Sequence, residues 1–293
     1  MAFRRARIPA LVVALLCAAS TLTSAQARNF LWRVEANGRV LHLAGSVHAL
    51  PQSAYPLPAA FQRAFDASGT LVEEIDLSEA GTLTALPLLM AKGMYSDGRT
   101  FEQSVSPETA ALVRRRLAAV PGMSELLQPM EPWVVALMLT ALQVQTAGLD
   151  TAIGLDQHFF DQAKSSGKAV VGLETAESQL DIFDRMPPPV QEQMLRSTLD
   201  DLDAGPGELQ AIVAAWRAGD TATIERQMLG GLRQLPGAYQ SLIVNRNRAW
   251  MPKIEACFAQ PRPCFVVVGA AHLVGPDGLL ALLQARGYRI TQQ

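Results

Sequence analysis

Strand-like segments lie at the two ends of this chain, and a long stretch with helical patterns separates them. Near the N-terminus, residues 31–35 and 39–44 flank Asn37-Gly38, a pair typical of a β-hairpin turn. Near the C-terminus, residues 264–269 form an apolar, β-branched run that is typical of a buried strand. Because a two-stranded hairpin alone is only marginally stable, we expect the strands of both ends to share one sheet.

The middle of the chain is predicted to be mostly helical. Two further short strands are expected at 69–77 and 168–172, and a last strand begins at Tyr288. Helices are expected at 59–65, 106–119, 132–147, most of 176–256, and 279–286. The fold class that follows is α/β, with a mixed β-sheet formed by the N- and C-terminal strands and a large helical insertion at about 78–256 packed over it.

Length and composition exclude several classes of protein. With 293 residues, the chain is long enough for one large domain or two modest ones. Its residues are 49% apolar and 18% charged, which is typical of a globular protein with a sizeable core and excludes a disordered chain. The formal net charge of −2 gives no basic surplus for phosphates, so we expect no nucleic-acid partner.

The N-terminal segment has the three parts of a secretory signal peptide. A basic start with three arginines is followed by an apolar run at 8–19 and a small-x-small cleavage site that ends at Ala27. The apolar run is shorter than the ~20 residues that a membrane-spanning helix needs. We therefore expect a signal peptide at 1–27 and a mature domain at 28–293 that is periplasmic or secreted and has no transmembrane segment. An uncleaved signal anchor is the alternative.

Export changes the meaning of the cysteines. Only Cys257 and Cys264 remain after processing, and an oxidising compartment favours a disulfide between them. Two prolines in the enclosed segment suit a tight surface loop. Two thiolates at this spacing match no common zinc pattern, so we expect a structural disulfide just before a strand.

Two Gly-x-x-His motifs follow strand-like runs at opposite ends of the chain. Gly45 and His48 follow the second N-terminal strand, and Gly269 and His272 follow the strand at 264–268. A glycine lets the backbone turn sharply or approach another group closely. One copy alone is more often a turn before an ordinary histidine. Two copies after strands predict side chains that meet beyond the carboxyl ends of the sheet, where α/β proteins bind ligands.

An acidic segment ends the strand expected at 69–77. If this strand is regular, Glu74 and Asp76 share one face and Glu73 lies on the other, and a shift of one residue would exchange the faces. An unpaired buried carboxylate is costly, so a cation or a histidine is expected nearby. Two histidines and one carboxylate form a recognised open ligand set for a catalytic metal. Which of the three acids would be the direct ligand stays open.

Several motifs together resemble the TraB/GumN family, which is related to the Tiki metalloproteases and, more distantly, to erythromycin-esterase-like proteins. The paired Gly-x-x-His motifs, in this order, are the most specific part of the resemblance. Ser46 lies where the first motif often has Thr, and Ala271 where the second often has Leu or Met. The resemblance extends over nearly the whole mature chain, in segments 31–35, 45–48, 55–58, 74–77, 154–159, 171–174, 246–250 and 268–278.

The resemblance implies a site and a cofactor. His48, Glu74 and His272 would form the metal and catalytic core, and Arg246 would be the cationic member of the site. The Tiki relatives are described as manganese- or cobalt-dependent proteases, so the resemblance implies a divalent metal, manganese or cobalt first and zinc as an alternative. It also implies a single TraB/GumN-like domain at 28–293 and a peptide or protein substrate.

Four further polar residues are secondary candidates for the site: Asp76, Asp156, His158 and Glu174. Asp156 and His158 are two residues apart on an expected helix, so they face different ways and form a poor chelating pair. Asp156 could instead cap or bridge helices, and His158 is expected to support the site or the core rather than to bind a metal. Glu174 follows a strand and either joins the site or precedes a helix capped by Thr175.

These observations favour a metal-dependent, protease-like hydrolase of the cell envelope. His48 and His272 would hold the ion, and Glu74 would complete its shell or act as general base on metal-bound water, whose pKa falls to about 7. Arg246 would stabilise the developing oxyanion or orient a substrate carboxylate. Two alternatives stay open: a non-enzymatic periplasmic protein that binds a metal or a haem-like ligand, and an accessory factor in polysaccharide export, which only the GumN name suggests.

Overall fold

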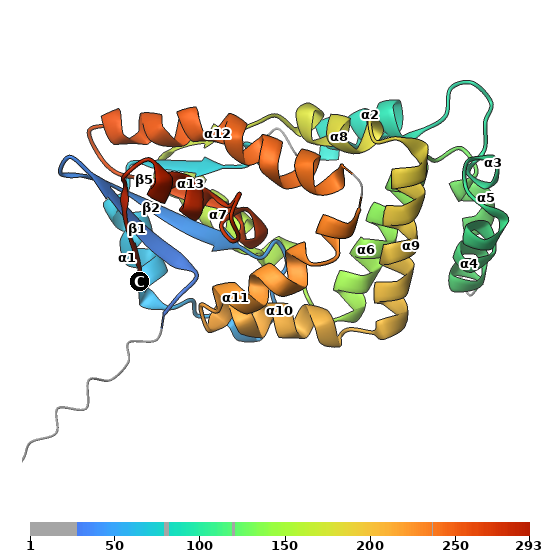
Figure 1. Cartoon of the computed structure of the whole chain (residues 1–293), viewed down its shortest axis with the longest axis horizontal. Coiled ribbons are helices and arrows are strands. Elements are labelled where there is room, and N and C mark those ends of the chain that lie inside the picture. Colours follow the sequence, from blue (N-terminus) through green and yellow to red (C-terminus); the bar gives the residue numbers. More distant parts are fainter. Residues whose placement is uncertain (1–27, 79–81, 119–120, 236) are drawn as a thin grey trace, which may run out of the picture.

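The computed structural model describes residues 28–78, 82–118, 121–235 and 237–293 (Figure 1). The predicted signal peptide at 1–27 lies outside the described residues. Within the described ranges, no helix combines the length and the apolar character that crossing a membrane requires.

The strands of both chain ends lie in one mixed, six-stranded sheet, as predicted. The strands are β1 Leu31–Ala36, β2 Arg39–Ser46, β3 Thr70–Glu73, β4 Ala169–Gly172, β5 Cys264–Gly269 and β6 Arg289–Gln292. Their order in the sheet is β4-β3-β5-β2-β1-β6. The strands β2 to β5 run parallel to one another, whereas β1 is antiparallel to its neighbours β2 and β6. The fold class is therefore α/β.

The β1–β2 hairpin turns at Asn37 and Gly38, the pair that predicted it. Both residues have positive φ angles, of 50° and 75°. This is the conformation of the tight turns whose twist matches that of antiparallel strands, and asparagine and glycine adopt it at the least steric cost. Ala36 consequently pairs with Arg39 across the turn.

The register of the sheet brings the two Gly-x-x-His motifs to one edge. The strand β5 lies between β2 and β3, and Ser46 at the end of β2 pairs with Gly269 at the end of β5. On the other side of β5, Glu73 at the end of β3 pairs with Val267. Because three neighbouring parallel strands end close together, the segments that follow them leave the sheet side by side.

Helices connect the strands and form the long middle of the chain, as predicted. Ser106 caps α4 by accepting from the backbone N–H of Thr109, and Pro107 is the first helical residue. Two π-helical segments, Glu225–Leu229 and Gln240–Val244, interrupt this part, and the second leads directly into α12. The helices are α1 Ala59–Ala67, α2 Thr82–Gly93, α3 Phe101–Ser104, α4 Pro107–Leu117, α5 Met123–Leu127, α6 Pro132–Thr146, α7 Leu155–Ser166, α8 Ala176–Asp184, α9 Pro188–Ala204, α10 Gly207–Arg217, α11 Thr221–Ile224, α12 Asn245–Ala256 and α13 Leu279–Ala285.

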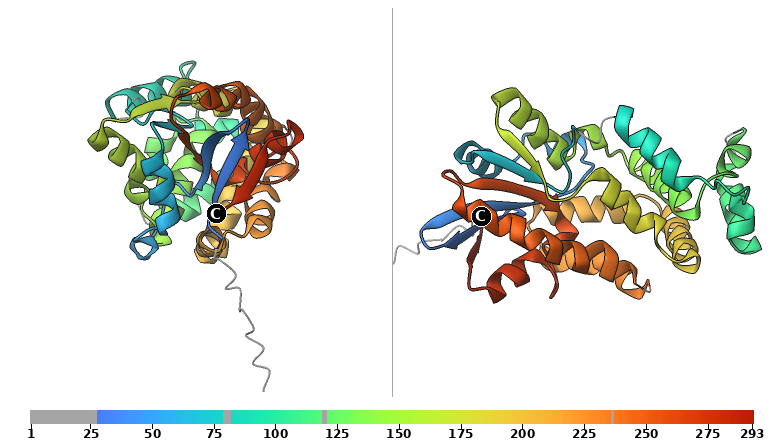
Figure 2. Two further views of the ribbon diagram at one scale, coloured as in Figure 1. Left: turned by 90° about the vertical axis from the view of Figure 1, so that its left-hand side faces the viewer. Right: turned by 90° about the horizontal axis from the view of Figure 1, so that it is seen from above.

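Helices cover both faces of the sheet (Figure 2). On one face, α1 and α7 pack on β5 through Phe65, Phe159 and Phe265, whose ring centroids lie 4.7 to 5.8 Å apart. The helices α12 and α13 lie on the opposite face. Away from the sheet, α6 and α9 enclose a second core that includes Trp133 and Leu195, and α3, α4 and α5 lie at the far end of the molecule (Figure 1).

The strand β3 is shorter than predicted. It ends at Glu73, and the chain bends directly after it. The regular alternation of faces therefore stops there, and the prediction that Glu74 and Asp76 share one face of a strand is wrong. Two groups from the segment after β4 hold the bend: the backbone N–H groups of Leu173 and Glu174 donate to the carbonyls of Glu73 and Glu74, each at 2.8 Å.

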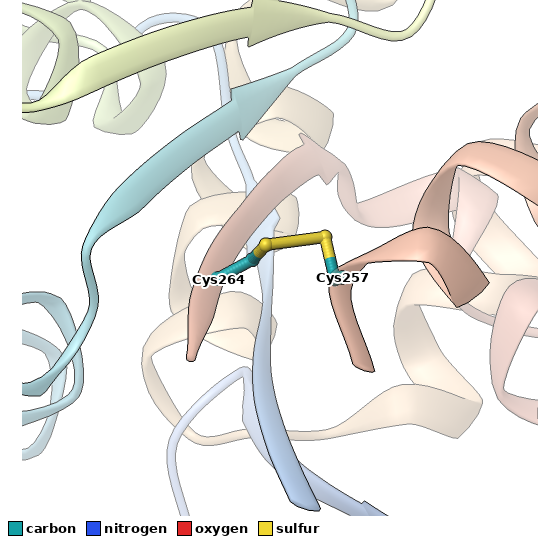
Figure 3. The surroundings of a disulfide bond; sticks show 2 residues. All are labelled: Cys257 and Cys264. Atoms are coloured by element: carbon teal, nitrogen blue, oxygen red, sulfur yellow. A yellow bond between two sulfur atoms is a disulfide. The ribbon is translucent and has the colours of Figure 1, made fainter. Parts of the chain in front are cut away.

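The predicted cysteine pair lies between the end of α12 and the start of β5 (Figure 3). Cys257 and Cys264 are joined as a disulfide, with their Cα atoms 5.7 Å apart, a usual separation for this bond. Both residues are buried. The crosslink ties the first residue of the central strand to the helix that precedes it.

Candidate functional site

His48 lies just beyond the end of β2 and is held by a carboxylate from α7. Its Nδ1 is 3.3 Å from Oδ1 of Asp156. The same oxygen accepts a hydrogen bond of 2.6 Å from the hydroxyl of Ser46, the last residue of β2. Asp156 lies in the first turn of α7, where the helix dipole favours a negative charge. This contact turns the other ring nitrogen of His48, Nε2, toward the end of β5.

His272 follows β5 and is held by α12. Its Nδ1 lies 2.7 Å from Oδ1 of Asn247, whose Nδ2 donates to the carbonyls of His272 and Asp277 at 3.1 and 2.8 Å. These donations fix which end of the amide carries the oxygen, so Nδ1 of His272 must donate a proton to Asn247. Its Nε2 accepts from Nη1 of Arg246 at 3.0 Å. His272 is therefore a neutral imidazole whose Nε2 lone pair faces the site.

Glu74 follows the bend after β3 and lies between the two histidine motifs. Its Oε1 accepts from the backbone N–H of Gly269 at 2.7 Å and lies 4.0 Å from Nε2 of His272. Its Oε2 accepts from Nη2 of Arg246 at 2.5 Å and from the amide of Gln179 at 3.2 Å. Because both oxygens accept hydrogen bonds and one faces a guanidinium, the carboxylate is ionised.

Arg246, near the start of α12, is the positive centre of the site. Its Nε and Nη2 donate to Oε1 of Glu174 at 3.1 and 2.6 Å. Its guanidinium carbon lies 4.7 Å from the ring centroid of Trp250, which is a cation–π contact. The side chains of Arg246, Glu74 and Glu174 are each only 11 to 12% exposed. One guanidinium thus offsets two buried carboxylates, which would be costly without it.

The three predicted core residues surround Gly269. A Cβ atom at this position would lie 3.1 Å from Oε1 of Glu74, 3.3 Å from Nε2 of His48 and 3.6 Å from Cδ2 of His272. The missing side chain therefore leaves a small space onto which one carboxylate and two imidazoles converge. The glycine of the second motif lets the backbone approach the site this closely.

The charges of the core groups follow from their surroundings. Burial raises the pKa of the Glu74 carboxyl, but the charges of Arg246 and His48 and the hydrogen bond from the backbone N–H of Gly269 lower it more, to about 2. Burial lowers the pKa of His272 to about 3, and the positive charges of Arg246 and His48 add to this effect. Desolvation also lowers the pKa of His48, but Asp156 and Glu74 outweigh it and raise that pKa to about 9. His48 is the most open of the three, with 59% of its side chain exposed.

A cavity of about 740 Å³ opens onto this centre. Ser46, His48, Glu74, Arg246 and His272 form its polar end. Most of its remaining lining residues are apolar, and six of them come from α6, from α10 and from the π-helical segment that follows α11. A concave, mostly apolar cavity with a few convergent polar groups is typical of sites that bind small molecules or single side chains.

Two of the secondary candidates lie outside the core. Oδ1 of Asp76 accepts from the backbone N–H and the hydroxyl of Ser78 at 2.9 and 2.6 Å, which is a local turn. The ring of His158 lies 5.1 Å from that of Tyr55, and its Nε2 contacts the amide of Gln162. Neither side chain contacts the three core residues. The other two, Asp156 and Glu174, hold His48 and Arg246.

Glu73 is buried and makes none of the contacts with His272 and Arg246 that Glu74 makes. It is 2% exposed, and neither of its carboxyl oxygens has a hydrogen-bond partner in the described part of the chain. Burial raises the pKa of Glu73 to about 9, and the nearby charge of Asp156 adds to the shift, so the carboxyl is neutral at pH 7. Of the three acids in this segment, Glu74 is therefore the one that the structure places beside His272 and Arg246.

The residue types of the core fit a divalent ion, but their ligand atoms do not lie close enough to bind one ion in this arrangement. Among the described residues, no three histidine, cysteine, aspartate or glutamate side chains are gathered closely enough to ligate one ion. Arg246 contacts Oε2 of Glu74 and Nε2 of His272, two of the atoms that an ion would take. Two imidazole nitrogens and one carboxylate nevertheless match the ligand chemistry of manganese, cobalt and zinc.

Comparison with known proteins identifies the family. The model of the TraB/PrgY/gumN family matches residues 30–292, which include every site residue described above. The chain belongs to the TraB/PrgY/gumN family. This confirms the resemblance that the motifs predicted.

Relatives of this TraB/PrgY/gumN protein include two uncharacterised proteins called YbaP. The chain is 28% identical to YbaP of Escherichia coli strain K12 over 248 residues, which are 84% of this chain and 88% of the relative. It is 28% identical to YbaP of Shigella flexneri over 245 residues, which are 83% and 87% of the two chains. No solved structure matches the chain. The comparisons therefore establish the family of the protein but not its reaction.

Sequence reasoning assigned no role to Asn247 or Ser46, which hold the histidines of this TraB/PrgY/gumN site. Asn247 is fully buried on α12 and contacts His272, and Ser46 is 1% exposed and contacts Asp156. In the sequence, Asn247 stands out only by its place in the family motif next to Arg246, and Ser46 only by its place inside the first Gly-x-x-His motif. Neither position predicts the contact with His272 or with Asp156, because these residues are distant in the sequence.

Proposed function

We propose that this protein is a metal-dependent hydrolase that cleaves peptide bonds in the cell envelope. His48, His272 and Glu74 would hold a divalent ion, with manganese or cobalt preferred over zinc on the family resemblance. The observation that carries the proposal is the convergence of one carboxylate oxygen and two imidazoles on the space at Gly269.

The other ring nitrogen of each histidine supports this role. Metal-binding histidines almost always use their second nitrogen to donate to a carboxylate, a carbonyl or water, which fixes the tautomer and the direction of the ring. Asp156 lies at this position for His48, and Asn247 lies at it for His272. The two partners come from different helices, α7 and α12, so the matched arrangement does not follow from a single local motif.

Arg246 would have to release two side chains for an ion to enter. It donates to both Glu74 and His272, and these contacts use atoms that would ligate the ion. Glu174 accepts two further hydrogen bonds from Arg246 and could keep the guanidinium next to the site after that release. In that position, Arg246 would stabilise the negative oxygen that forms when a carbonyl is attacked.

The remaining roles follow from where the side chains lie. A bound divalent ion supplies Lewis acidity, which makes hydroxide available near neutral pH and polarises a carbonyl oxygen. Glu74, which Gly269 holds through Oε1, would complete the ligand set or take a proton from the attacking water. His48 is exposed to the large cavity, so a substrate would reach the centre from the side of His48.

We further propose that the protein acts in the periplasm or outside the cell. The predicted signal peptide supports this location, and so does the disulfide between Cys257 and Cys264, because disulfides persist mainly in oxidising compartments. Mass spectrometry of the protein from cell fractions would test it. We expect a mature N-terminus at Arg28, and a protein that keeps Met1 in the cytoplasmic fraction would contradict the proposal.

Metal content and peptide cleavage test the function directly. We expect the purified protein to bind about one manganese ion per chain and to cleave members of a peptide library, with EDTA abolishing cleavage and manganese restoring it. His48→Ala and His272→Ala should each lose the ion and the activity. His158→Ala is the matched control, since His158 lies outside the core and should be dispensable for both.

Two results would contradict the proposal in different ways. A protein that binds no divalent ion would exclude the metal-dependent reaction. A protein that binds the ion at His48 and His272 but cleaves no peptide would be a metal-binding protein, the non-enzymatic alternative. Cleavage at the wild-type rate by Glu74→Gln would exclude the role of Glu74 alone.

A further inference from the structure

We propose that the 740 Å³ cavity binds a large apolar side chain of a peptide substrate, next to the bond that is cleaved. This inference rests on the proposed function, which places the cleaved bond at the polar end of the cavity. It adds a substrate class, because it states which peptides the site prefers. The cavity is large enough for one bulky side chain with its neighbours and lies within the usual size of ligand pockets.

Much of the apolar wall of the cavity comes from α6, α10 and the neighbouring π-helical segment. Leu137, Ala141 and Val144 of α6 line it at helical spacing. Leu209 and Ile212 of α10 also line it, together with Met228 of the π-helical segment. None of these six residues is fully buried, so their apolar surface is open to an incoming ligand.

Few charged residues line this cavity. Apart from Asp150, the charged and titratable residues lining the cavity are His48, Glu74, Arg246 and His272, which all belong to the site. A charged side chain entering between α6 and α10 would lose water without finding a partner, which is costly. A leucine or phenylalanine side chain would instead gain the free energy of apolar burial. The wall therefore selects against charged residues at this position of the substrate.

Two features favour a peptide over a fatty acyl chain. Thr140, Gln145 and Thr151 place hydroxyl and amide groups on the wall, which can exchange hydrogen bonds with a peptide backbone but not with an alkyl chain. Arg246 also borders a second cavity of about 550 Å³, which is lined by polar residues such as Ser178 and Asn245 and by apolar ones such as Ile182 and Met186. An extended chain with side chains on both sides of Arg246 would use both cavities.

Binding measurements separate this inference from the hydrolase proposal. Fluorescently labelled peptides that differ only in a central leucine or aspartate are titrated with the protein in EDTA, so that binding is read without cleavage. We expect the leucine peptide to bind at least about tenfold more tightly, as burial of one large apolar side chain predicts. Fluorescence anisotropy measures both affinities. Failure of cleavage would then contradict only the hydrolase proposal.

A pair of variants on α6 shows whether binding uses this cavity. Ala141→Trp fills the cavity from an exposed position on its wall and should weaken binding of the leucine peptide about tenfold. Leu142→Trp is the matched control, because Leu142 is 38% exposed on the same helix and does not line the cavity. Equal binding of the two peptides, or no effect of Ala141→Trp, would overturn the inference. So would tight binding of dodecanoate with no binding of either peptide.

Discussion

Arg246 donates a hydrogen bond of 3.0 Å to Nε2 of His272, and this contact defines the state of the site. A guanidinium can only donate, so His272 must offer a lone pair at Nε2. On the opposite side of the ring, Asn247 accepts the proton at Nδ1. The histidine is thus already in the form that binds metal ions, and an arginine contacts the nitrogen that an ion would use.

Replacing Arg246 by glutamine should make the stability of the protein depend on a divalent ion. Without the guanidinium, the buried carboxylates of Glu74 and Glu174 lose their shared partner, so the free energy of unfolding should fall by about 3–5 kcal/mol. Manganese should restore part of this loss, because Glu74 and His272 become available to it. Thermal unfolding with and without manganese measures both effects.

Arg248→Gln is the matched control for that variant. Arg248 lies two residues after Arg246 on α12, is 64% exposed and is 3.8 Å from Asp277. Its loss should change the free energy of unfolding by less than about 1 kcal/mol and should add no response to manganese. If manganese leaves the melting temperature of Arg246→Gln unchanged, the ion does not bind at Glu74 and His272.

Gly269→Ala should weaken metal binding while the fold persists. The backbone at Gly269, with φ −51° and ψ 137°, accepts an alanine. Its Cβ, however, would lie 3.1 Å from Oε1 of Glu74 and 3.3 Å from Nε2 of His48, in the space where these groups converge. We expect the manganese affinity to fall at least about tenfold in isothermal titration calorimetry. Gly207→Ala, whose Cβ would meet nothing within 4 Å, is the control, and equal affinities of all three proteins would place the ion elsewhere.

Asn247→Ala should destabilise the protein, and His272 should no longer be held in a single tautomer. The change leaves the Nδ1–H of His272 and two backbone carbonyls without a partner in a fully buried position. The free energy of unfolding should fall by about 2–4 kcal/mol, measured by urea denaturation. Nitrogen NMR should show a mixture of tautomers at His272. Asn245→Ala, at an exposed position on the same helix, should change neither quantity, and an unchanged His272 spectrum in Asn247→Ala would contradict the assignment.

His42 should make the protein less stable in mild acid. It is 9% exposed, and burial lowers its pKa to about 4, with a further contribution from the charge of Arg33. Because the unfolded chain takes up this proton near pH 6.5 and the folded chain only near pH 4, stability is lost as the pH falls through this window. In His42→Gln, the free energy of unfolding should decrease between pH 7 and pH 4 by about 2 kcal/mol less than in the wild type, as measured by urea unfolding. Parallel pH profiles for the two proteins would show that His42 does not contribute.

Local patterns were sufficient to predict the sheet and the meeting of the histidines. The hairpin at Asn37-Gly38 depends on backbone conformations that few residue pairs adopt. The β-branched run of β5 predicts a buried strand wherever it occurs in a chain. Since parallel strands align their carboxyl ends, the two Gly-x-x-His motifs at strand ends were enough to place His48 and His272 at one edge.

Contacts between distant segments account for what the sequence could not predict. Alternation assigns a face to a residue only while its strand continues, and β3 ends where Leu173 and Glu174 donate to it from another part of the chain. Asp156 was judged by its spacing from His158, but its partner is His48. The spacing between Asp156 and His158 therefore gave no information about the contact that Asp156 makes in the fold.

Cys257 follows the last residue of α12, and Cys264 is the first residue of β5. The covalent link between them lies at the opposite end of both elements from Arg246 and Gly269. The crosslink therefore fixes the spacing between the helix that carries Arg246 and the strand that leads to His272, about 15 Å of helix away from the guanidinium. The two halves of the site are thus fastened to each other at a point that no ligand has to reach.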